Sequence, residues 1–425
     1  MPPRGPEGRR GAGRLLAGAA LLALALAAAA REAPREAPYV VGAYYFGAFA
    51  PSATGVIEGN RRVHGRQGDW WGGVSDFYGA EPGIAPDRRG WAGEWPHLKP
   101  AIGYYDQRSV KTLERHIRQA SDAGLGFFSF YWYWSDRKRG ELLPEALLAF
   151  RAARNPAPLR FNLSLFAHPW DEDMAITEAN AEEVARRIAS YFSDPNYLRL
   201  QDGRPVFAIG DNRNFRDPAG RRCGDARCHS RAVARFVAKL RRISRETAGA
   251  DPFVQMHSET PGWDSTPEVD GVTCLMPPMT LGAGTPYPRF RLAALEPLGR
   301  AAKPVSPCML QNFDERPRQD VLVRERSAIR YFVGKTGERL RENLRAAKAL
   351  SDAQFARTGH PATRIVYLYA WNEWHEGGIL EPNAKDGARD LDIVSEVFAL
   401  PRVPSPCLDE ARCDPEDAPR RPGRP

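Results

Sequence analysis

The stretch RIVYLYAWNEW, residues 364–374, is apolar from 365 to 371 and then changes abruptly to polar and charged side chains. Its β-branched and aromatic residues show no clean alternation of polar and apolar positions, which predicts a strand buried on both faces. The overlapping stretch WNEWHEGGILEP, residues 371–382, places Glu373 and Glu376 just after that strand. The glycines at 377 and 378 predict a turn there. The sequence therefore predicts two carboxylates, set among aromatic residues, at the end of a buried strand.

Upstream of this strand, apolar runs alternate with helical patterns. Val110, Leu113 and Ile117 recur at helical spacing directly before the apolar run 125–134. Such alternation is typical of a parallel sheet covered by helices. The predicted strands are residues 39–49, 125–134, 159–168, 204–210, 251–257, 271–276, 304–313 and 364–374, and the longer predicted helices are 109–124, 180–192, 230–249 and 339–353.

Eight strands in one α/β domain favour a (β/α)8 TIM barrel with long βα loops. A doubly wound sheet is the alternative, but no glycine-rich phosphate loop follows the first strand. We expect a single catalytic domain at residues 39–400.

The two ends of the chain differ in composition from this domain. Four arginines precede an uncharged run, residues 15–30, that closes in three alanines, as in a signal peptide. We expect a signal peptide at 1–30, a linker at 31–38 and a disordered proline-rich tail at 401–425. The protein is then secreted or periplasmic, with an uncleaved membrane anchor as the alternative. The formal net charge of +8 includes the arginines of the signal, and no dense basic run indicates nucleic-acid binding.

The chain has six cysteines. An even count behind an export signal predicts disulfides, whereas the ligand types around Cys223, Cys228 and His229 fit no common zinc spacing. The predicted pairs are Cys223–Cys228 and Cys407–Cys413, which leaves Cys274 and Cys308 to each other.

The carboxylate pair is the leading candidate for catalysis, because active sites of such barrels lie at the C-terminal ends of the strands. Tyr369, Trp371 and Glu373 share one face of an extended strand, and a bend at the glycine pair brings Glu376 to the same site. Two neighbouring carboxylates can divide acid and base work, since like charges push their pKa values apart. A solvated rim is the structural alternative for the pair.

Further substrate-binding candidates are polar or aromatic residues near strand ends, and packing is the alternative for each. Aromatic rings stack on the apolar faces of sugars but also fill cores. Glu259 lies near one of these strand ends and could line a cleft. We interpret the acidic run 171–173 as a solvated loop, and we predict no metal or cofactor. The substrate-binding candidates are Tyr45, Trp132, Trp134, His257, Asn372 and His375.

The stretch WNEWHEGGILEP closely resembles the signature of glycoside hydrolase family 99, the endo-α-mannosidases, and of the related WbsX-type proteins of polysaccharide gene clusters. The resemblance extends through residues 44–45, 103–106, 130–134, 191–209 and 312–318, and it covers roughly residues 40 to 400. It implies a retaining (β/α)8 barrel that acts on α-mannosides. By motif position, Glu373 would deprotonate the 2-hydroxyl of the sugar, which closes onto C1 as a 1,2-anhydro intermediate. Glu376 would act as acid and then base, so the family departs from the usual two-carboxylate scheme.

The sequence thus predicts a secreted glycoside hydrolase whose partner is a glycan or polysaccharide. A WbsX-type glycosyltransferase and a non-catalytic glycan-binding barrel are the alternatives. The export signal argues against the first, because nucleotide-sugar donors are cytosolic, and the intact carboxylates argue against the second. Contact with a membrane is expected only if the N-terminal segment stays uncleaved. The linkage cut, and whether it lies within a chain or at its end, does not follow from the sequence.

Overall fold

The computed structural model describes residues 38–50, 99–156, 159–276, 282–287, 290–315 and 330–408. The predicted signal peptide, nearly all of the linker, most of the loop between 50 and 100 and most of the C-terminal tail lie outside these ranges. Within them, no helix is long and apolar enough to cross a membrane.

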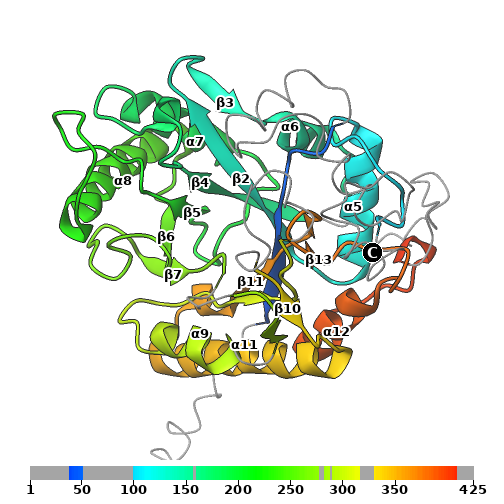
Figure 1. The fold of residues 1–425 in the computed structure, drawn as a ribbon. Coiled ribbons are helices and arrows are strands. Elements are labelled where there is room, and N and C mark those ends of the chain that lie inside the picture. The colour runs from blue at the N-terminus through cyan, green and yellow to red at the C-terminus, as the bar shows by residue number, and fades with distance from the viewer. Residues whose placement is uncertain are drawn as a thin grey trace, which may run out of the picture. The chain divides into compact units, whose positions relative to one another are not determined.

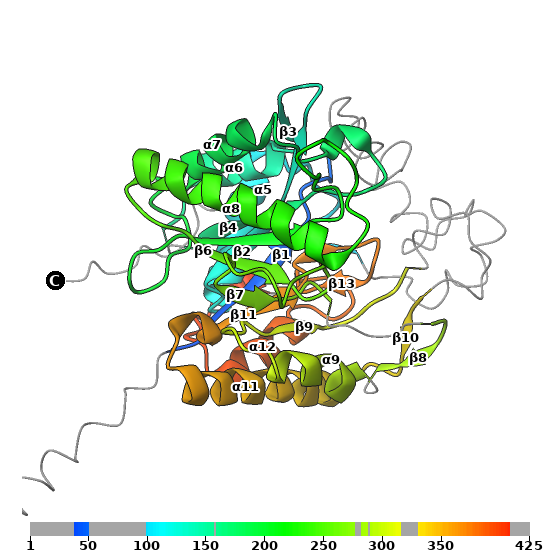
Figure 2. The same ribbon diagram turned by 90° about the vertical axis from the view of Figure 1, so that its left-hand side faces the viewer.

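Eight parallel strands form a nearly closed barrel and follow one another around it in chain order (Figures 1 and 2). β1 pairs with β2 on one side and with β11 on the other, and a bridge between Val272 and Val305 joins the β7 and β9 segments. The predicted (β/α)8 barrel is thereby confirmed. The strands are β1 (Val40–Tyr45), β2 (Phe127–Ser135), β4 (Arg160–Phe166), β5 (Val206–Asp211), β6 (Phe253–His257), β7 (Gly271–Thr273), β9 (Cys308–Leu310) and β11 (Ile365–Tyr369).

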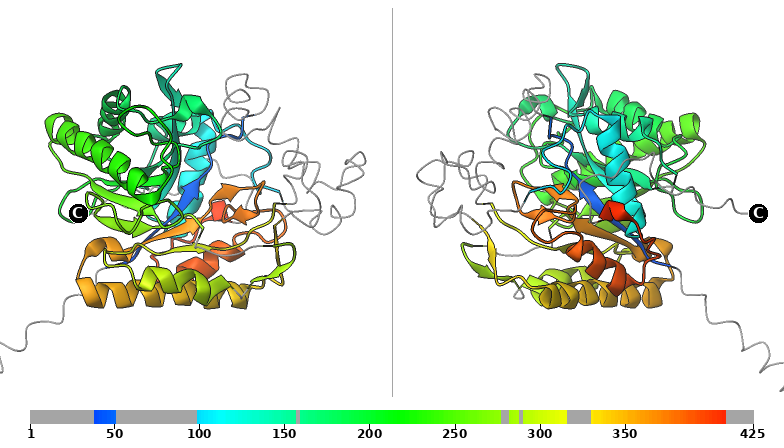
Figure 3. Two further views of the ribbon diagram at one scale, coloured as in Figure 1. Left: turned by 60° about the vertical axis from the view of Figure 1, so that its left-hand side comes forward. Right: turned by 90° about the vertical axis from the view of Figure 1, so that its right-hand side faces the viewer.

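Helices cover the outside of the barrel. α7 and α8 lie against the side of β4 to β6, whereas α9, α11 and α12 lie together on the side of β9 and β11 (Figures 1 and 3). In α5, Leu113 and Ile117 are buried, as their helical spacing predicts. The helices are α5 (Val110–Asp122), α6 (Glu145–Ala152), α7 (Ala181–Tyr191), α8 (Ala226–Ala248), α9 (Phe290–Gly299), α11 (Gly337–Thr358) and α12 (Arg389–Phe398), with 3-10 turns at Glu172–Met174, Pro361–Arg364 and Pro406–Leu408.

Short strands decorate the barrel. β3 (Gly140–Leu142) folds back antiparallel on the far end of β2, and β8 (Thr285–Pro286) pairs with β10 (Phe332–Val333). β12 (Asn372–Glu373) and β13 (Gly378–Ile379) form an antiparallel hairpin directly after β11. We call residues 371–381 the catalytic hairpin, because the sequence predicts the catalytic pair there. The turn predicted at the glycine pair is therefore present.

The interior of the barrel contains a layer of paired polar side chains. The Tyr367 hydroxyl donates to Gln255 Oε1 at 3.1 Å and accepts from Asn162 Nδ2 at 3.1 Å. Gln255 Nε2 donates to Ser306 Oγ at 2.6 Å. Each of these four side chains makes at least one hydrogen bond, which offsets most of the cost of burying it, although Asn162 Oδ1 has no partner among the described residues.

Two of the predicted disulfides are confirmed. Cys223 is bonded to Cys228 near the start of α8, and Cys274 is bonded to Cys308. The second bond joins the end of β7 to the first residue of β9, at the seam where β7 and β9 share only a single bridge. The third predicted pair includes Cys413, which lies outside the described residues.

Candidate active site

The catalytic hairpin stands at the C-terminal end of the barrel, where the parallel strands all finish. The last turn of the hairpin is held by the Glu376 amide, which donates to the Glu373 carbonyl at 3.0 Å. Gly377 follows with a φ of 68°, and a Cβ there would lie 2.8 Å from that of Asp314. A glycine at this position therefore allows the bend that places Glu373 and Glu376 on one hairpin.

The two carboxylates have different surroundings. Glu373 is buried, with 7% of its surface exposed, and it lies near Tyr131 of β2. Glu376 is half-buried and accepts a hydrogen bond from the Tyr369 hydroxyl at the end of β11. Its backbone carbonyl accepts from the Asp314 amide at 2.6 Å, which ties the hairpin to the segment after β9. Unlike environments are what allow two carboxyl groups to take different proton-transfer roles.

Tyr131 is a hydrogen-bond donor without a partner in the described part of the chain. Its hydroxyl oxygen is buried, and its ring lies 5.0 Å from Phe166 and 5.8 Å from Tyr44. Burial raises the pKa of Tyr131 well above its ordinary value, and the nearby charge of Glu373 adds to that rise. The phenol therefore keeps its proton and can donate a hydrogen bond to a ligand at the barrel mouth.

His257 lines the same interior at the end of β6, as the sequence predicts for this strand end. The Tyr44 hydroxyl donates to the Cys274 carbonyl at 2.7 Å, so its oxygen accepts from His257 Nε2 at 3.1 Å. Burial lowers the pKa of His257 to about 3. The ring is therefore neutral at pH 7, and its Nδ1 is an acceptor with no partner among the described residues.

Glu259, two residues further on, has a carboxyl whose pKa is raised well above its ordinary value. Although its surface is exposed, the carboxyl is surrounded by protein, and desolvation raises the pKa of Glu259 to about 8. Hydrogen bonds from the backbone amides of Leu275 and Met276 oppose this rise. At neutral pH Glu259 is therefore mostly protonated and can donate a hydrogen bond.

Three of the predicted substrate-binding residues point away from the barrel interior. The Tyr45 hydroxyl lies 2.8 Å from His116 Nδ1 of α5, outside the barrel. Trp132 stacks on Trp134 and donates from Nε1 to Glu141 Oε1 at 3.0 Å. All three are buried between the strands and their outer cover. The structure does not bring them to the carboxylates.

Asn372 and His375 lie in the catalytic hairpin itself and are buried. Asn372 Oδ1 accepts from the Phe46 amide at 2.8 Å, and its Nδ2 donates to the Phe46 carbonyl at 3.0 Å. The amide therefore clamps the hairpin to the chain leaving β1. The His375 ring lies 6.1 Å from that of Phe49.

Glu381 closes the hairpin and is the centre of a buried network behind it. Only 1% of its surface is exposed, and its Oε2 accepts from the Tyr105 hydroxyl at 2.8 Å and from Trp374 Nε1 at 3.1 Å. Its Oε1 lies 3.1 Å from His116 Nε2. If His116 Nε2 donates to Glu381, its Nδ1 accepts from the Tyr45 hydroxyl. Each side chain of this network then has a hydrogen-bond partner. Glu381 thus fixes the tryptophan that stands between the two candidate catalytic carboxylates.

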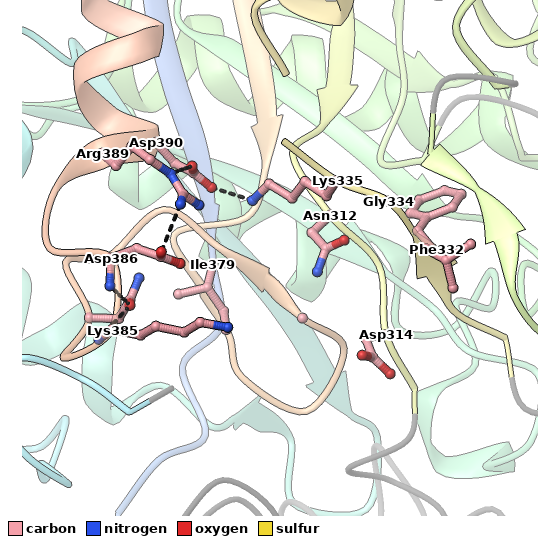
Figure 4. A pocket seen from close by; sticks show the side chains of 13 residues that line it. Asn312, Asp314, Phe332, Gly334, Lys335, Ile379, Lys385, Asp386, Arg389 and Asp390 are labelled. Atoms are coloured by element: carbon pink, nitrogen blue, oxygen red, sulfur yellow. Dashed lines mark hydrogen bonds and ion pairs between the residues drawn. The ribbon is translucent and has the colours of Figure 1, made fainter. Parts of the chain in front are cut away.

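A polar pocket of about 340 Å³ adjoins the tip of the hairpin at Gly377 and Ile379 (Figure 4). It lies between the segment after β9, the segment after β10 and the start of α12. Lys335 pairs there with Asp390, and Arg389 pairs with Asp386 at 2.7 Å. Because these opposite charges offset each other, the pocket suits a neutral polar ligand better than an ion.

Sequence reasoning missed several residues that the structure brings to the site. Tyr44 and Tyr131 face the interior, whereas the sequence analysis chose their neighbours Tyr45 and Trp132 as candidates. Glu381 was not considered, although it belongs to the stretch that contains Glu373 and Glu376. Trp170, after β4, is 56% exposed. Its exposure has no signature in the sequence. No group of three or more His, Cys, Asp or Glu residues in the described ranges is arranged to hold a metal ion.

Comparisons with known proteins agree with this architecture. The family model described as glycosyltransferase WbsX matches residues 91–394. The uncharacterized protein WxcX of Xanthomonas campestris pv. campestris strain ATCC 33913 is 26% identical over 353 residues, which are 79% of this chain and 47% of that protein. WxcX of strain B100 matches with the same identity and coverage. The chain therefore spans about half the length of the curated relatives it matches.

Two solved structures share the fold. A glycoside hydrolase-like protein superimposes with a TM-score of 0.54 at 17% identity, covering 86% of this chain and 95% of that one. The GH99 endo-α-mannosidase of Bacteroides thetaiotaomicron gives a TM-score of 0.50 at 16% identity, covering 84% and 95%. At these identities the likeness establishes a common barrel.

Proposed function

This chain belongs to the family described as glycosyltransferase WbsX, and we propose that it is a retaining glycoside hydrolase that cleaves α-mannosidic linkages in a glycan or polysaccharide. The observation that carries the proposal is the catalytic hairpin, which presents two carboxylates in unlike surroundings at the mouth of a glycoside hydrolase-like barrel. The resemblance of the motif to the endo-α-mannosidases supplies the substrate class.

In this proposal Glu373 is the base and Glu376 the acid. Glu373 takes the proton of the sugar 2-hydroxyl, whose oxygen forms a bond to C1 while the bond from C1 to the leaving oxygen breaks. Glu376 gives its proton to that oxygen. In the second step Glu376 takes a proton from water, the water oxygen bonds to C1 while the bond from C1 to the 2-oxygen breaks, and Glu373 returns a proton to that 2-oxygen. Two inversions at C1 give net retention.

The groups around the pair support these roles. Tyr369 donates to Glu376 and so can orient it toward the leaving oxygen. The protonated hydroxyl of Tyr131, near Glu373, is available to a sugar oxygen. His257 and Glu259 supply a neutral acceptor and a neutral donor further along the wall. Such a wall suits a hydroxyl-rich, uncharged substrate.

The test is the release of reducing sugar from α-mannans and aryl α-mannosides by the protein and two variants. Glu373→Gln and Glu376→Gln should each lower the rate about 10²- to 10⁴-fold. An activated aryl leaving group should restore part of the first step in Glu376→Gln but less in Glu373→Gln, because it needs little protonation. Trapping of a covalent ester by a 2-fluoro mannoside on Glu259, Asp264, Asp314 or Glu315 would replace this mechanism with an ordinary protein nucleophile.

A glycosyltransferase is the second candidate, because the description of the family names one. Incubation with nucleotide-sugar donors and mannosyl acceptors separates the two. Transfer that depends on the donor, without hydrolysis of any α-mannoside, would select the transferase.

We also infer that the protein works outside the cytosol. The buried Cys274–Cys308 bond fits an oxidising compartment, and the sequence of residues 1–30 reads as a signal peptide. N-terminal sequencing of exported protein should begin close to Arg31. A chain that retains Met1 and stays in the membrane fraction would exclude cleavage.

A further inference from the structure

Trp170 is the most exposed large apolar side chain in the described part of the protein. It lies in the segment after β4, at the mouth of the barrel, with 56% of its surface open. Single exposed apolar residues are common on protein surfaces. The neighbours of Trp170 distinguish it, because they hold the ring in one orientation.

Three residues from two strand ends support the Trp170 ring. His168 stacks on it with ring centroids 4.1 Å apart and planes at 17°. The Asp211 carboxylate lies 2.8 Å from His168 Nδ1, and the Arg213 guanidinium lies 5.8 Å from the centre of the Trp170 ring. Arg213 also donates to both oxygens of Asp211, at 2.9 and 2.7 Å.

The charges in this cluster are fixed at neutral pH. Burial alone would raise the pKa of Asp211. Hydrogen bonds from His168 and Arg213 outweigh this effect and lower the pKa to about 2. Burial lowers the pKa of His168, so its ring stays neutral and donates to the carboxylate. Trp170 therefore rests on a neutral ring that is locked by a salt bridge, which reduces the conformational entropy lost when a ligand stacks on it.

An unbroken series of rings leads from this cluster to the candidate catalytic pair. His168 lies 5.6 Å from Phe166 and 5.8 Å from Tyr133. Phe166 lies 5.0 Å from Tyr131, whose pKa is raised in part by Glu373. We call these rings, from Trp170 to Tyr131, the aromatic strip. Phe166 and Tyr133 are buried, so the strip itself offers no stacking surface. It instead places Trp170 on the same wall as Tyr131 and several rings away from it, where a further unit of the same glycan can lie.

We propose that Trp170 forms a distal sugar-binding subsite, in which a neutral hexose unit of the glycan stacks its apolar face on the indole while Arg213 donates hydrogen bonds to its hydroxyls. The side chain of Arg213 is half exposed, so N–H groups of its guanidinium remain accessible to a ligand. The proposal rests on the proposed function, since it assumes that the bound molecule is a glycan.

The first experiment compares kinetics on α-manno-oligosaccharides of increasing length with those on an aryl α-mannoside. Trp170→Ala should raise KM by about three- to tenfold on the longest substrates, the range expected for one aromatic contact. The effect should grow with substrate length. Trp170→Phe should restore most of the affinity, and Leu148→Ala, an exposed site on α6, is the matched control with unchanged KM. Equal effects of Trp170→Ala on all substrates would overturn the subsite.

A second measurement separates this proposal from the reaction itself. Affinity electrophoresis in gels that contain α-mannan or other neutral polysaccharides reports binding without turnover. If the wild type hydrolyses no α-mannoside but its retardation is lost in Trp170→Ala, the subsite stands and the proposed reaction fails. If none of these polysaccharides retards the wild type, or if Trp170→Ala is retarded equally, the subsite is wrong whether or not hydrolysis occurs.

Discussion

Buried polar groups on the two sides of the catalytic hairpin differ in whether they have hydrogen-bond partners. Behind it, Glu381 accepts from Tyr105 and Trp374 and lies within hydrogen-bond distance of His116. In front of it, the Tyr131 hydroxyl and His257 Nδ1 are buried without partners among the described residues. Since an unsatisfied buried group costs about 1–3 kcal/mol, the front is less stable than it could be. We therefore expect the network behind the hairpin to fix its geometry, and the groups in front of it to gain hydrogen bonds from a bound glycan.

The largest expected effect on stability comes from removing the hydrogen-bond network behind the hairpin. Glu381→Ala removes the carboxylate that accepts from Tyr105 and Trp374 and lies beside His116, and it should lower the free energy of unfolding by about 3–5 kcal/mol. Glu381→Gln keeps one acceptor and should cost about 1–3 kcal/mol. Chemical denaturation measures both. Glu376→Gln, on the front, is the control and should change stability by less than about 1 kcal/mol while abolishing most activity. Similar stabilities for the Glu381 and Glu376 variants would remove the contrast between the two sides.

A smaller effect on stability, of opposite sign, is expected for the unpartnered hydroxyl in front of the hairpin. Tyr131→Phe removes a buried hydroxyl that lacks a partner, so it should leave stability unchanged or raise it by up to about 1 kcal/mol. The same change should lower kcat/KM about tenfold, because the donor is needed once substrate is bound. Thermal melting and kinetics on one preparation test both. A variant that is destabilised and fully active would show that Tyr131 is an ordinary core residue.

The smallest effect concerns pH. Desolvation raises the pKa of Glu259 from its ordinary value of 4.5 to about 8. The folded protein therefore binds this proton more tightly than the unfolded chain, and its contribution to stability is lost as pH rises from about 4.5 toward 8. Glu259→Gln carries no such proton, so its melting temperature should fall less than that of the wild type between pH 5 and 8. Parallel melting curves for the two proteins over this range would contradict the assignment.

The sequence was sufficient for the barrel but not for the direction of its side chains. All eight strands were predicted, yet Tyr45 was selected where Tyr44 faces the interior, and Trp132 where Tyr131 does. Strands of a parallel barrel are apolar on both faces, so the alternation that would reveal the inward face is hidden. The predicted strands at 271–276 and 304–313 were too long for a related reason, since the backbone leaves the sheet while its apolar side chains remain buried or partly buried.

The candidate site was predictable only where one short motif carries it. Glu373 and Glu376 lie only three residues apart in the sequence, and Gly377 marks the turn that leads into β13. Glu381 belongs to the same motif, but its role depends on Tyr105 and His116, which come from distant parts of the chain. Similarly, Trp170 gains its orientation from residues after β5. Such tertiary contacts leave no local pattern that sequence reasoning can detect.

The pairing of β1 with β11 has a consequence for how the protein is made. Val40 pairs with Ile365, so the first strand lacks one neighbour until nearly all of the domain has left the ribosome. Until then, β1 presents an open edge of backbone donors and acceptors that can pair with other chains. The catalytic hairpin follows β11 directly, so a nascent chain stopped before β11 has neither a closed barrel nor its carboxylates. Barrel closure and the appearance of the site are thus a single late event in the folding of the chain.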